Sequence, residues 1–232
     1  MQPEFRTVQT GVPGAAQGIA LQQQKVLRNT YMLLALSLIP TAIGAAIGTN
    51  IDLGFMRTSP MLSFVLILAV FYGWIYAIER NKESSLGVAL LLGFTLFLGL
   101  LLGPLLHRTL GFKNGTELVM MAAGGTAAVF FVMAGIASTT KRDFSGLAGF
   151  LTVGAVVIML GVVASLFMHS PVLYVVVLGG FVVLSSLMIM WQVNRIVQGG
   201  ETNYISATLT LYISIYNLFS ALLQLLGMGG RN

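Results

Sequence analysis

Polar side chains recur along one face of the last apolar segment of the chain, residues 206–227. At steps of four, three and seven residues this segment carries Thr210, Ser214, Asn217 and Gln224. Such spacing places all four on one side of a helix. Their hydroxyl and amide groups could line a path for a small cation or form hydrogen bonds to neighbouring helices. Because polar groups are costly against lipid, we expect this face to point at other helices or at water.

A second polar row lies beside the first and is formed by Tyr212, Tyr216 and Ser220. Two rows leave little helix surface for lipid, so we expect this last helix to be a central post with the other helices packed around it. Among the polar groups within apolar segments, Asn217 and Gln192 are the hardest to leave unpaired. Each could stabilise the bundle through an interhelical hydrogen bond, worth about 0.6 kcal/mol on average, or contact a ligand. The sequence leaves both roles open.

Several kinds of catalysis need residue types that this chain lacks at membrane depth. Asp52 and Asp143 are the only aspartates and fall in predicted loops, which excludes a pair of intramembrane catalytic aspartates. His107 and His169 lie at segment ends, away from any GxSxG serine motif, and two such histidines are more often interfacial side chains than metal ligands. The chain has no cysteine, no HExxH motif and no P-loop. We predict a protein that is not an enzyme and holds no cofactor or metal.

Charged residues gather at the ends of the apolar segments. A proton-coupled transporter usually keeps an acid or base near the membrane midplane, and no charged residue falls clearly there. Glu79 and Arg80, followed by Lys82 and Glu83, could form a cluster of ion pairs. A solvated loop at the membrane surface accounts for the same charges.

Composition places the whole chain in a membrane. Of its 232 residues, 56% are hydrophobic and 8% are charged, against about 25% charged in soluble domains. The net charge of +5 does not indicate nucleic-acid binding, since no basic run exceeds two residues. A spanning helix needs about 20 apolar residues. Seven segments qualify, which predicts a single all-α domain over residues 26–232: 29–48, 61–79, 86–106, 117–138, 146–168, 171–193 and 206–227.

The segments before and between these spans carry further signals. Residues 1–25, rich in Gln, Gly and Ala, show no sustained hydrophobic period and predict a flexible cytoplasmic tail. Gly199 and Gly200 predict the end of one helix, and Thr202 or Asn203 can cap the next. Short links between segments predict that each helix lies beside its neighbour in sequence.

Basic residues in the loops indicate the orientation of the chain. With the N-terminus in the cytoplasm, eight basic residues fall inside and four outside. The inner set is Arg6, Lys25, Arg28, Arg80, Lys82, Lys141, Arg142 and Arg195, and the outer set is Arg57, Arg108, Lys113 and Arg231. This bias predicts a cytoplasmic N-terminus and a periplasmic C-terminus.

Two GxxxG motifs predict close contacts between helices. Gly44 and Gly48 form one in the first segment, and Gly99 and Gly103 form another in the third. Small residues let helix backbones approach closely, which is the main route to packing where lipid is as apolar as leucine. We expect these motifs to serve packing within one bundle rather than dimerisation.

Five stretches resemble the Bax inhibitor-1 family, most closely its bacterial YccA branch. They are KVLRNTY (25–31), GPLLH (103–107), GGTAAVFF (124–131), TTKRDFSGLAGFL (139–151) and RIVQGGETNYISATLTLYISIYNLF (195–219). The resemblance implies seven helices with the last one wrapped by the other six, in the bacterial cytoplasmic membrane. It also implies binding to the membrane-anchored ATP-dependent protease FtsH and restraint of its action on other membrane proteins.

The chain departs from this family at one site. Other members carry a pH-dependent calcium leak based on two aspartates, and the resemblance places those positions at Gln192 and Ser214. Neither side chain can ionise, so a proton-operated latch between carboxylates is not available. Calcium prefers several oxygen ligands that include carboxylates, so we expect no well-populated calcium site. A small cation leak remains the alternative function.

Overall fold

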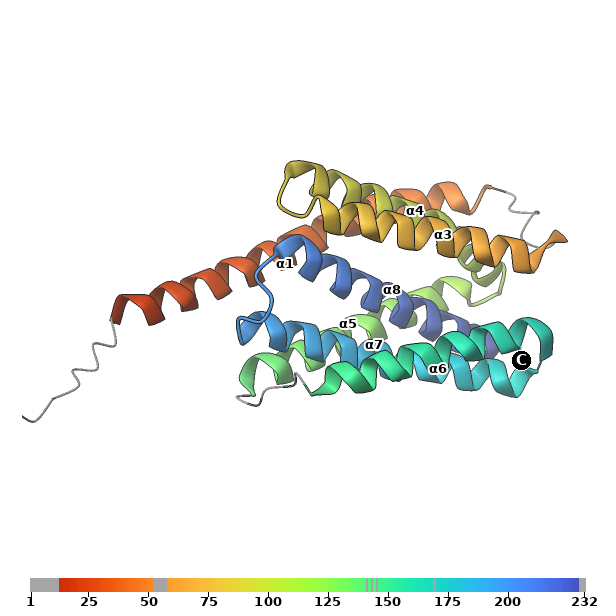
Figure 1. Cartoon of the computed structure of the whole chain (residues 1–232). Coiled ribbons are helices and arrows are strands. Elements are labelled where there is room, and N and C mark those ends of the chain that lie inside the picture. Colours follow the sequence, from red (N-terminus) through yellow and green to blue (C-terminus); the bar gives the residue numbers. More distant parts are fainter. Residues whose placement is uncertain are drawn as a thin grey trace, which may run out of the picture.

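The computed structural model describes residues 13–51, 58–140, 142, 144, 146–168 and 170–229, with side chains from residue 21 onward. This part of the chain forms seven helices that are long and apolar enough to cross a membrane. They are α1 (Pro13–Gly48), α3 (Pro60–Arg80), α4 (Ser85–Leu110), α5 (Gly115–Thr139), α6 (Leu147–Met168), α7 (Pro171–Val197) and α8 (Tyr204–Gly229). The predicted all-α class with seven apolar helices is confirmed (Figure 1).

The first helix differs from its prediction because it begins at Pro13, inside the stretch 1–25 that was predicted to be a flexible tail. Proline suits the first turn of a helix, and the Ala, Gln, Leu and Lys residues that follow are strong helix formers even without a hydrophobic period. Val26 anchors this region because it is buried against Ile196 and Ala207. Residues 1–12 lie outside the described residues, and the division into tail and membrane domain stays a prediction.

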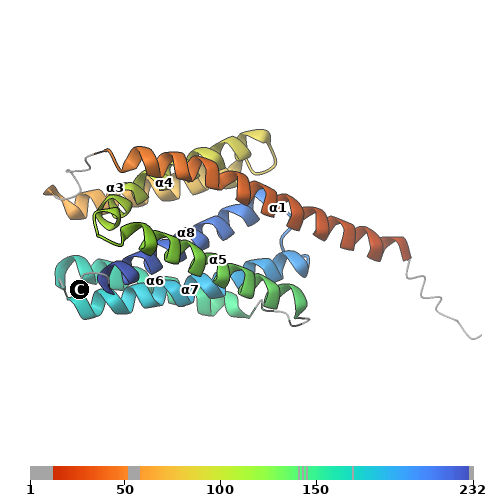
Figure 2. The ribbon, with the colours of Figure 1, turned by 180° about the vertical axis from the view of Figure 1, so that it is seen from behind.

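The helices pack in an order that differs from their order in sequence. α3 lies beside α4, and α6 packs mainly against α7. α8 packs against α1, α3, α4, α5 and α7. Figures 1 and 2 show α3 and α4 on one side of the molecule and α6 and α7 on the other. The prediction that sequence neighbours lie side by side is wrong at two links: α1 packs mainly against α4 rather than α3, and α5 packs against α7 and α8 rather than α6.

The two GxxxG motifs meet each other where α1 crosses α4, the most extensive helix pair in the bundle. A Cβ atom on Gly99 would overlap the carbonyl oxygen of Thr41 and lie 3.0 Å from the backbone nitrogen of Ala45. In the other direction, a Cβ on Gly44 would overlap the carbonyl oxygen of Leu96. The predicted close packing within one bundle is therefore present, with backbone directly against backbone.

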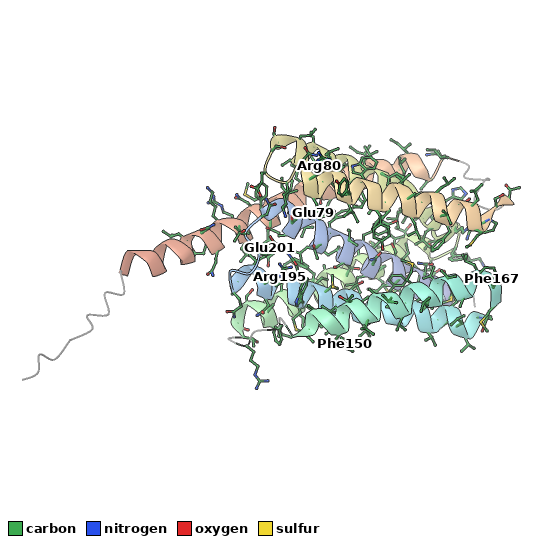
Figure 3. The ribbon with its side chains drawn as sticks, viewed as in Figure 1. Glu79, Arg80, Phe150, Phe167, Arg195 and Glu201 are labelled. Carbon is green, nitrogen blue, oxygen red and sulfur yellow. The ribbon has the colours of Figure 1, made fainter. Side chains whose placement is uncertain are left out.

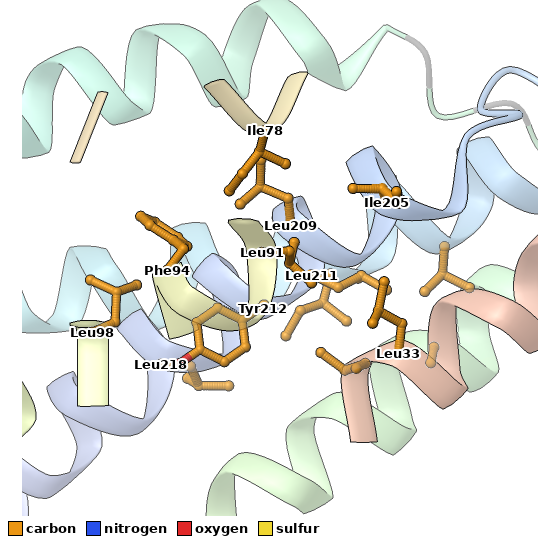
Figure 4. Close-up of a cluster of buried hydrophobic side chains, with 14 of the residues drawn as sticks. Leu33, Ile78, Leu91, Phe94, Leu98, Ile205, Leu209, Leu211, Tyr212 and Leu218 are labelled. Atoms are coloured by element: carbon orange, nitrogen blue, oxygen red, sulfur yellow. The ribbon is translucent and has the colours of Figure 1, made fainter. Parts of the chain in front are cut away.

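The hydrophobic core joins residues of α8 to residues of α1, α3, α4, α5 and α7 (Figure 4). Leu211 and Leu218 of α8 are fully buried, together with Leu91 and Phe94 of α4 and Ile78 of α3. No residue from Tyr204 to Met228 falls in the exposed class. By contrast, Phe150 on α6 is 60% exposed, as expected for a side chain that faces lipid.

Candidate functional site on the last helix

The hydroxyl groups of the predicted polar face bond to the backbone of their own helix. Thr210 donates to the carbonyl oxygen of Ser206 at 3.1 Å, and Ser214 donates to that of Thr210 at 2.8 Å. Hydroxyls that donate to the carbonyl four residues earlier have their hydrogen-bond donors satisfied within their own helix. Their lone pairs remain available, but their protons do not point toward a ligand.

Gln192 on α7 is one of the buried polar side chains in this region without a hydrogen-bond partner among the described residues, together with Trp191 and Ser220. Gln192 is 1% exposed, and no group of the described residues accepts a hydrogen bond from its Nε2. A buried amide without a partner costs about 1–3 kcal/mol, so its environment is a place to look for water or a ligand. Ser214 is 4% exposed, but the hydrogen bonds of the described residues do not join it to Gln192. The structure buries both predicted positions without pairing them.

Tyr212 connects three helices near the crossing of α1 and α4. Its hydroxyl lies 2.6 Å from Thr41 Oγ1 and 3.3 Å from the carbonyl oxygen of Thr95. Thr41 Oγ1 is also 2.7 Å from the carbonyl oxygen of Ser37. The second polar row is therefore part of the packing interface, and this hydrogen-bonded group holds α8 against α1 and α4.

Toward the C-terminal end of α8, the polar face makes a hydrogen bond to α7. Gln224 donates to the carbonyl oxygen of Ser220 at 2.9 Å and accepts a hydrogen bond from the hydroxyl of Tyr174 on α7. Asn217 is partly buried, and its side chain takes part in none of the hydrogen bonds found among the described residues. Whether Thr210, Ser214, Asn217 and Gln224 contact a ligand stays a prediction.

The predicted ion-pair cluster is rearranged at the end of α3 (Figure 3). Glu79 Oε2 lies 3.2 Å from Lys82 Nζ and accepts a hydrogen bond of 2.9 Å from the hydroxyl of Ser206. Arg80 is exposed and belongs to neither of the two ion pairs of the described chain. Lys82 lies in the turn just after α3 ends at Arg80, and from there its ammonium group reaches back to Glu79.

Asn203 joins the start of α8 to the loop between α3 and α4. Its Oδ1 accepts from the backbone amides of Ile205 and Ser206 at 2.9 and 3.1 Å, which confirms the predicted capping role. Its Nδ2 donates to the carbonyl oxygen of Lys82 at 3.0 Å and to Glu83 Oε1 at 2.9 Å. This second function was missed because the sequence gives no sign that the two loops meet.

An ion pair and a cation–π contact of Arg195 stabilise the turn before Asn203. Arg195 and Glu201 approach to 3.6 Å, and the Arg195 guanidinium lies 4.7 Å from the centre of the Trp191 ring. Gly199 has φ of 79°, a left-handed conformation that favours glycine at the end of a helix. Figure 3 places Arg195 and Glu201 at the same end of the bundle as Glu79.

Asn194 is a further residue that the sequence did not single out. It is 1% exposed, and its Oδ1 accepts from the amide of Phe144 at 3.1 Å, while its Nδ2 donates to the carbonyl oxygen of Arg142 at 3.1 Å. The side chain thereby ties the connection between α5 and α6 to α7. A lone asparagine beside a basic residue at a helix end carries no sequence signal for such a role.

Acidic and imidazole groups do not converge in the part of the chain that the structure describes. It contains no group of three or more His, Cys, Asp or Glu side chains able to hold a metal. Asp52, Asp143 and His169 lie outside the described residues. What the geometry brings together is a set of hydroxyl and amide groups around α8, suited to hydrogen bonding between helices.

Comparisons with known proteins extend over almost the full chain. Residues 23–231 match a family model described as Inhibitor of apoptosis-promoting Bax1. An uncharacterized protein of Neisseria meningitidis serogroup A is 47% identical over 208 residues, covering 89% of this chain and 92% of the relative. The Modulator of FtsH protease YccA of Escherichia coli K12 is 41% identical over 212 residues, 91% and 94% of the two chains. A relative of the same identity and coverage in E. coli O6:H1 is named Inner membrane protein YccA.

Proposed function

The chain belongs to the Bax inhibitor-1 family, and we propose that it binds and restrains the membrane-anchored protease FtsH without catalysis of its own. The observation that carries this proposal is the 41% identity, over 91% of the chain, to a protein named as a modulator of that protease. Identity at this level over nearly the full length of both proteins supports a shared partner. We further infer that the protein resides in the bacterial cytoplasmic membrane, as the name of a second relative says of that protein.

The proposed orientation places the start of α1 in the cytoplasm. Eight of the twelve basic residues fall on that side, which supports it under the positive-inside rule. An odd number of spans then puts the C-terminus in the periplasm. The ATP-driven part of the protease would meet the end of the bundle that contains the start of α1 and the loops at residues 81–84 and 198–203.

The proposed mechanism combines an accessible end with a bundle that resists extraction. The first turns of α1 project beyond the other helices (Figure 1), where an unfoldase could grip the chain. Pulling on α1 would work against its backbone contact with α4 and the hydrogen bonds of Tyr212. We propose that α8 is the central element of this bundle, since it packs against α1, α3, α4, α5 and α7. A protease occupied by such a chain degrades other membrane proteins more slowly.

Restraint of the protease can be measured directly. In proteoliposomes that contain FtsH and a second membrane substrate, we expect the full chain to co-purify with FtsH and to slow degradation of that substrate. Deleting residues 2–20 should abolish most of this restraint, because it removes the segment available for gripping. A variant in which residues 2–12 are replaced by a Gly/Ser stretch of equal length is the matched control for sequence recognition.

The outcomes separate the parts of the proposal. Unchanged restraint by the deletion variant would remove the N-terminal segment from the mechanism and leave binding intact. Failure of the full chain to co-purify with FtsH from native membranes would overturn the proposed function itself.

A small cation leak is the second candidate function, and the oxygen atoms of Thr210, Ser214 and Asn217 on the polar face of α8 are the groups that could line its path. In calcium-loaded liposomes we expect the parent protein to conduct no more than protein-free vesicles, because neither Gln192 nor Ser214 carries a charge. Changing both Gln192→Asp and Ser214→Asp should create flux that depends on pH if the family's passage is preserved. Ser84→Asp, in an exposed loop, is the control for added charge. Calcium flux through the parent protein would favour the leak over the regulator.

A further inference from the structure

A cavity of about 900 Å³ opens at the end of the bundle where α4 and α8 begin. Its rim is polar and carries Lys25 and Asn29 of α1 together with Lys82 of the loop after α3. Its wall is apolar and is formed by Val88, Ala89 and Leu92 on the first turns of α4. None of the residues on the polar face of α8 lines this cavity, so it is a separate feature.

The cavity lies at the level where lipid headgroups meet the hydrocarbon. The apolar stretch of α1 follows Lys25 and Asn29, as in the predicted span 29–48, and the candidate spans of α4 and α8 begin at Ser85 and Tyr204. The polar rim therefore sits at the boundary of the spans, and the apolar wall lies about one to two turns deeper. This order of a charged head and an apolar wall matches the chemistry of a phospholipid.

The face of α1 that carries Lys25 and Asn29 becomes apolar further along the helix, away from the cavity. From Lys25 and Asn29 it runs at helical spacing to Met32, Leu36 and Ile39. These three apolar side chains are 65%, 47% and 58% exposed, so they form an uncovered stripe. An acyl chain whose headgroup occupies the cavity would lie along this stripe.

The charges of the rim favour an anionic group. Lys25 belongs to no ion pair within the described residues. The ammonium group of Lys82 is already paired with Glu79, at 3.2 Å. Glu83 also lines the cavity, and its Oε1 accepts a hydrogen bond of 2.9 Å from the side-chain amide of Asn203. Lys25 is thus the cation with no acidic partner, and an incoming phosphate would be its counter-charge.

We propose that this cavity binds the headgroup of a phospholipid from the adjacent leaflet, with its phosphate against Lys25 and one acyl chain along α1. The inference goes beyond the proposed action on the protease and does not depend on it. The lipid would pack between α1 and α4, beside the start of the helix pair that holds the bundle together.

Native mass spectrometry of the full chain in detergent, titrated with phosphatidylglycerol, tests this site. Lys25→Gln should weaken binding about five-fold, since one cation near an anionic lipid contributes about 1 kcal/mol. Arg28→Gln is the matched control, because Arg28 is exposed one turn along the same helix and does not line the cavity. Ala89→Trp, which fills the wall without changing charge, should also weaken binding.

Two further ligands identify what is recognised. Diacylglycerol lacks the phosphate and should bind weakly and equally to the parent and to Lys25→Gln. The water-soluble sn-glycerol 3-phosphate lacks the acyl chains and should compete poorly. Equal loss of phosphatidylglycerol binding in Lys25→Gln and Arg28→Gln would overturn the site, as would unchanged binding by Ala89→Trp. Tight binding of sn-glycerol 3-phosphate alone would assign the cavity to a soluble phosphate ester instead.

Discussion

Replacing Gly99 by alanine is expected to separate α1 from α4 and to lower the free energy of unfolding by about 3 kcal/mol, the upper end of the cost of overpacking. The added methyl group would overlap the carbonyl oxygen of Thr41. Because the obstacle is backbone, no change of rotamer can relieve it, and the helices must move apart. In a membrane their association depends on this close packing, since lipid supplies no hydrophobic driving force between helices.

Gly135→Ala is the matched control for this change. Gly135 is exposed on α5, and a Cβ there meets no atom within 4 Å. We expect its stability to be unchanged or raised by up to about 1 kcal/mol, because alanine is the better helix former. Unfolding in a series of detergent mixtures, followed by circular dichroism, should therefore show a clear loss of stability for Gly99→Ala and none for Gly135→Ala. Equal behaviour would mean that the contact between α1 and α4 does not control stability.

The same pair of variants tests the proposed mechanism of protease restraint. If resistance to extraction keeps the protease occupied, Gly99→Ala should itself be degraded faster and should restrain FtsH less than the parent. Gly135→Ala should restrain it as the parent does. A destabilised Gly99→Ala that still restrains the protease fully would show that binding, and not mechanical resistance, is responsible.

Helix number and position could be predicted from the sequence because they depend on local composition. The predicted segment 171–193 corresponds to α7 at Pro171–Val197, and the proline marks its first turn. The start of α1 at Pro13 was missed, because its first turns are made of good helix formers that show no hydrophobic period. Local signals therefore locate the spans well and their polar extensions poorly.

The partners of individual residues could not be predicted in the same way. A GxxxG motif shows that a backbone can be approached, but not that Gly99 of α4 would meet Thr41 of α1. The charges at 79–83 indicated a possible cluster of ion pairs, but not that Glu79 would pair with Lys82 in the turn after α3 while Arg80 stays outside the pair. Asn194 and Asn203 join loops that are distant in sequence, and no local pattern reports such contacts.

Replacing Asn203 by alanine should lower the free energy of unfolding by about 2 kcal/mol, about half from the lost helix cap and half from the lost hydrogen bonds to the neighbouring loop. Its Oδ1 satisfies two backbone amides at the start of α8, and its Nδ2 bonds to the carbonyl oxygen of Lys82 and to Glu83. With alanine these groups lose their partners at a position that is 9% exposed. The detergent unfolding assay used for Gly99→Ala measures the change.

Aspartate at this position separates the two contributions. Asn203→Asp keeps an acceptor for the amides of Ile205 and Ser206 and remains a good cap, but it removes the donor and sets a second carboxylate beside Glu83. We expect Asn203→Asp to be destabilised, and less so at high salt, because Glu83 is exposed and its repulsion is screened. Adding Glu83→Gln supplies an amide that can donate to the new carboxylate, so the double variant should recover most of the loss, while Glu83→Gln alone should change little. If Asn203→Asp matches the parent, the cap accounts for the whole effect of Asn203, and the bond between the loops contributes nothing to stability.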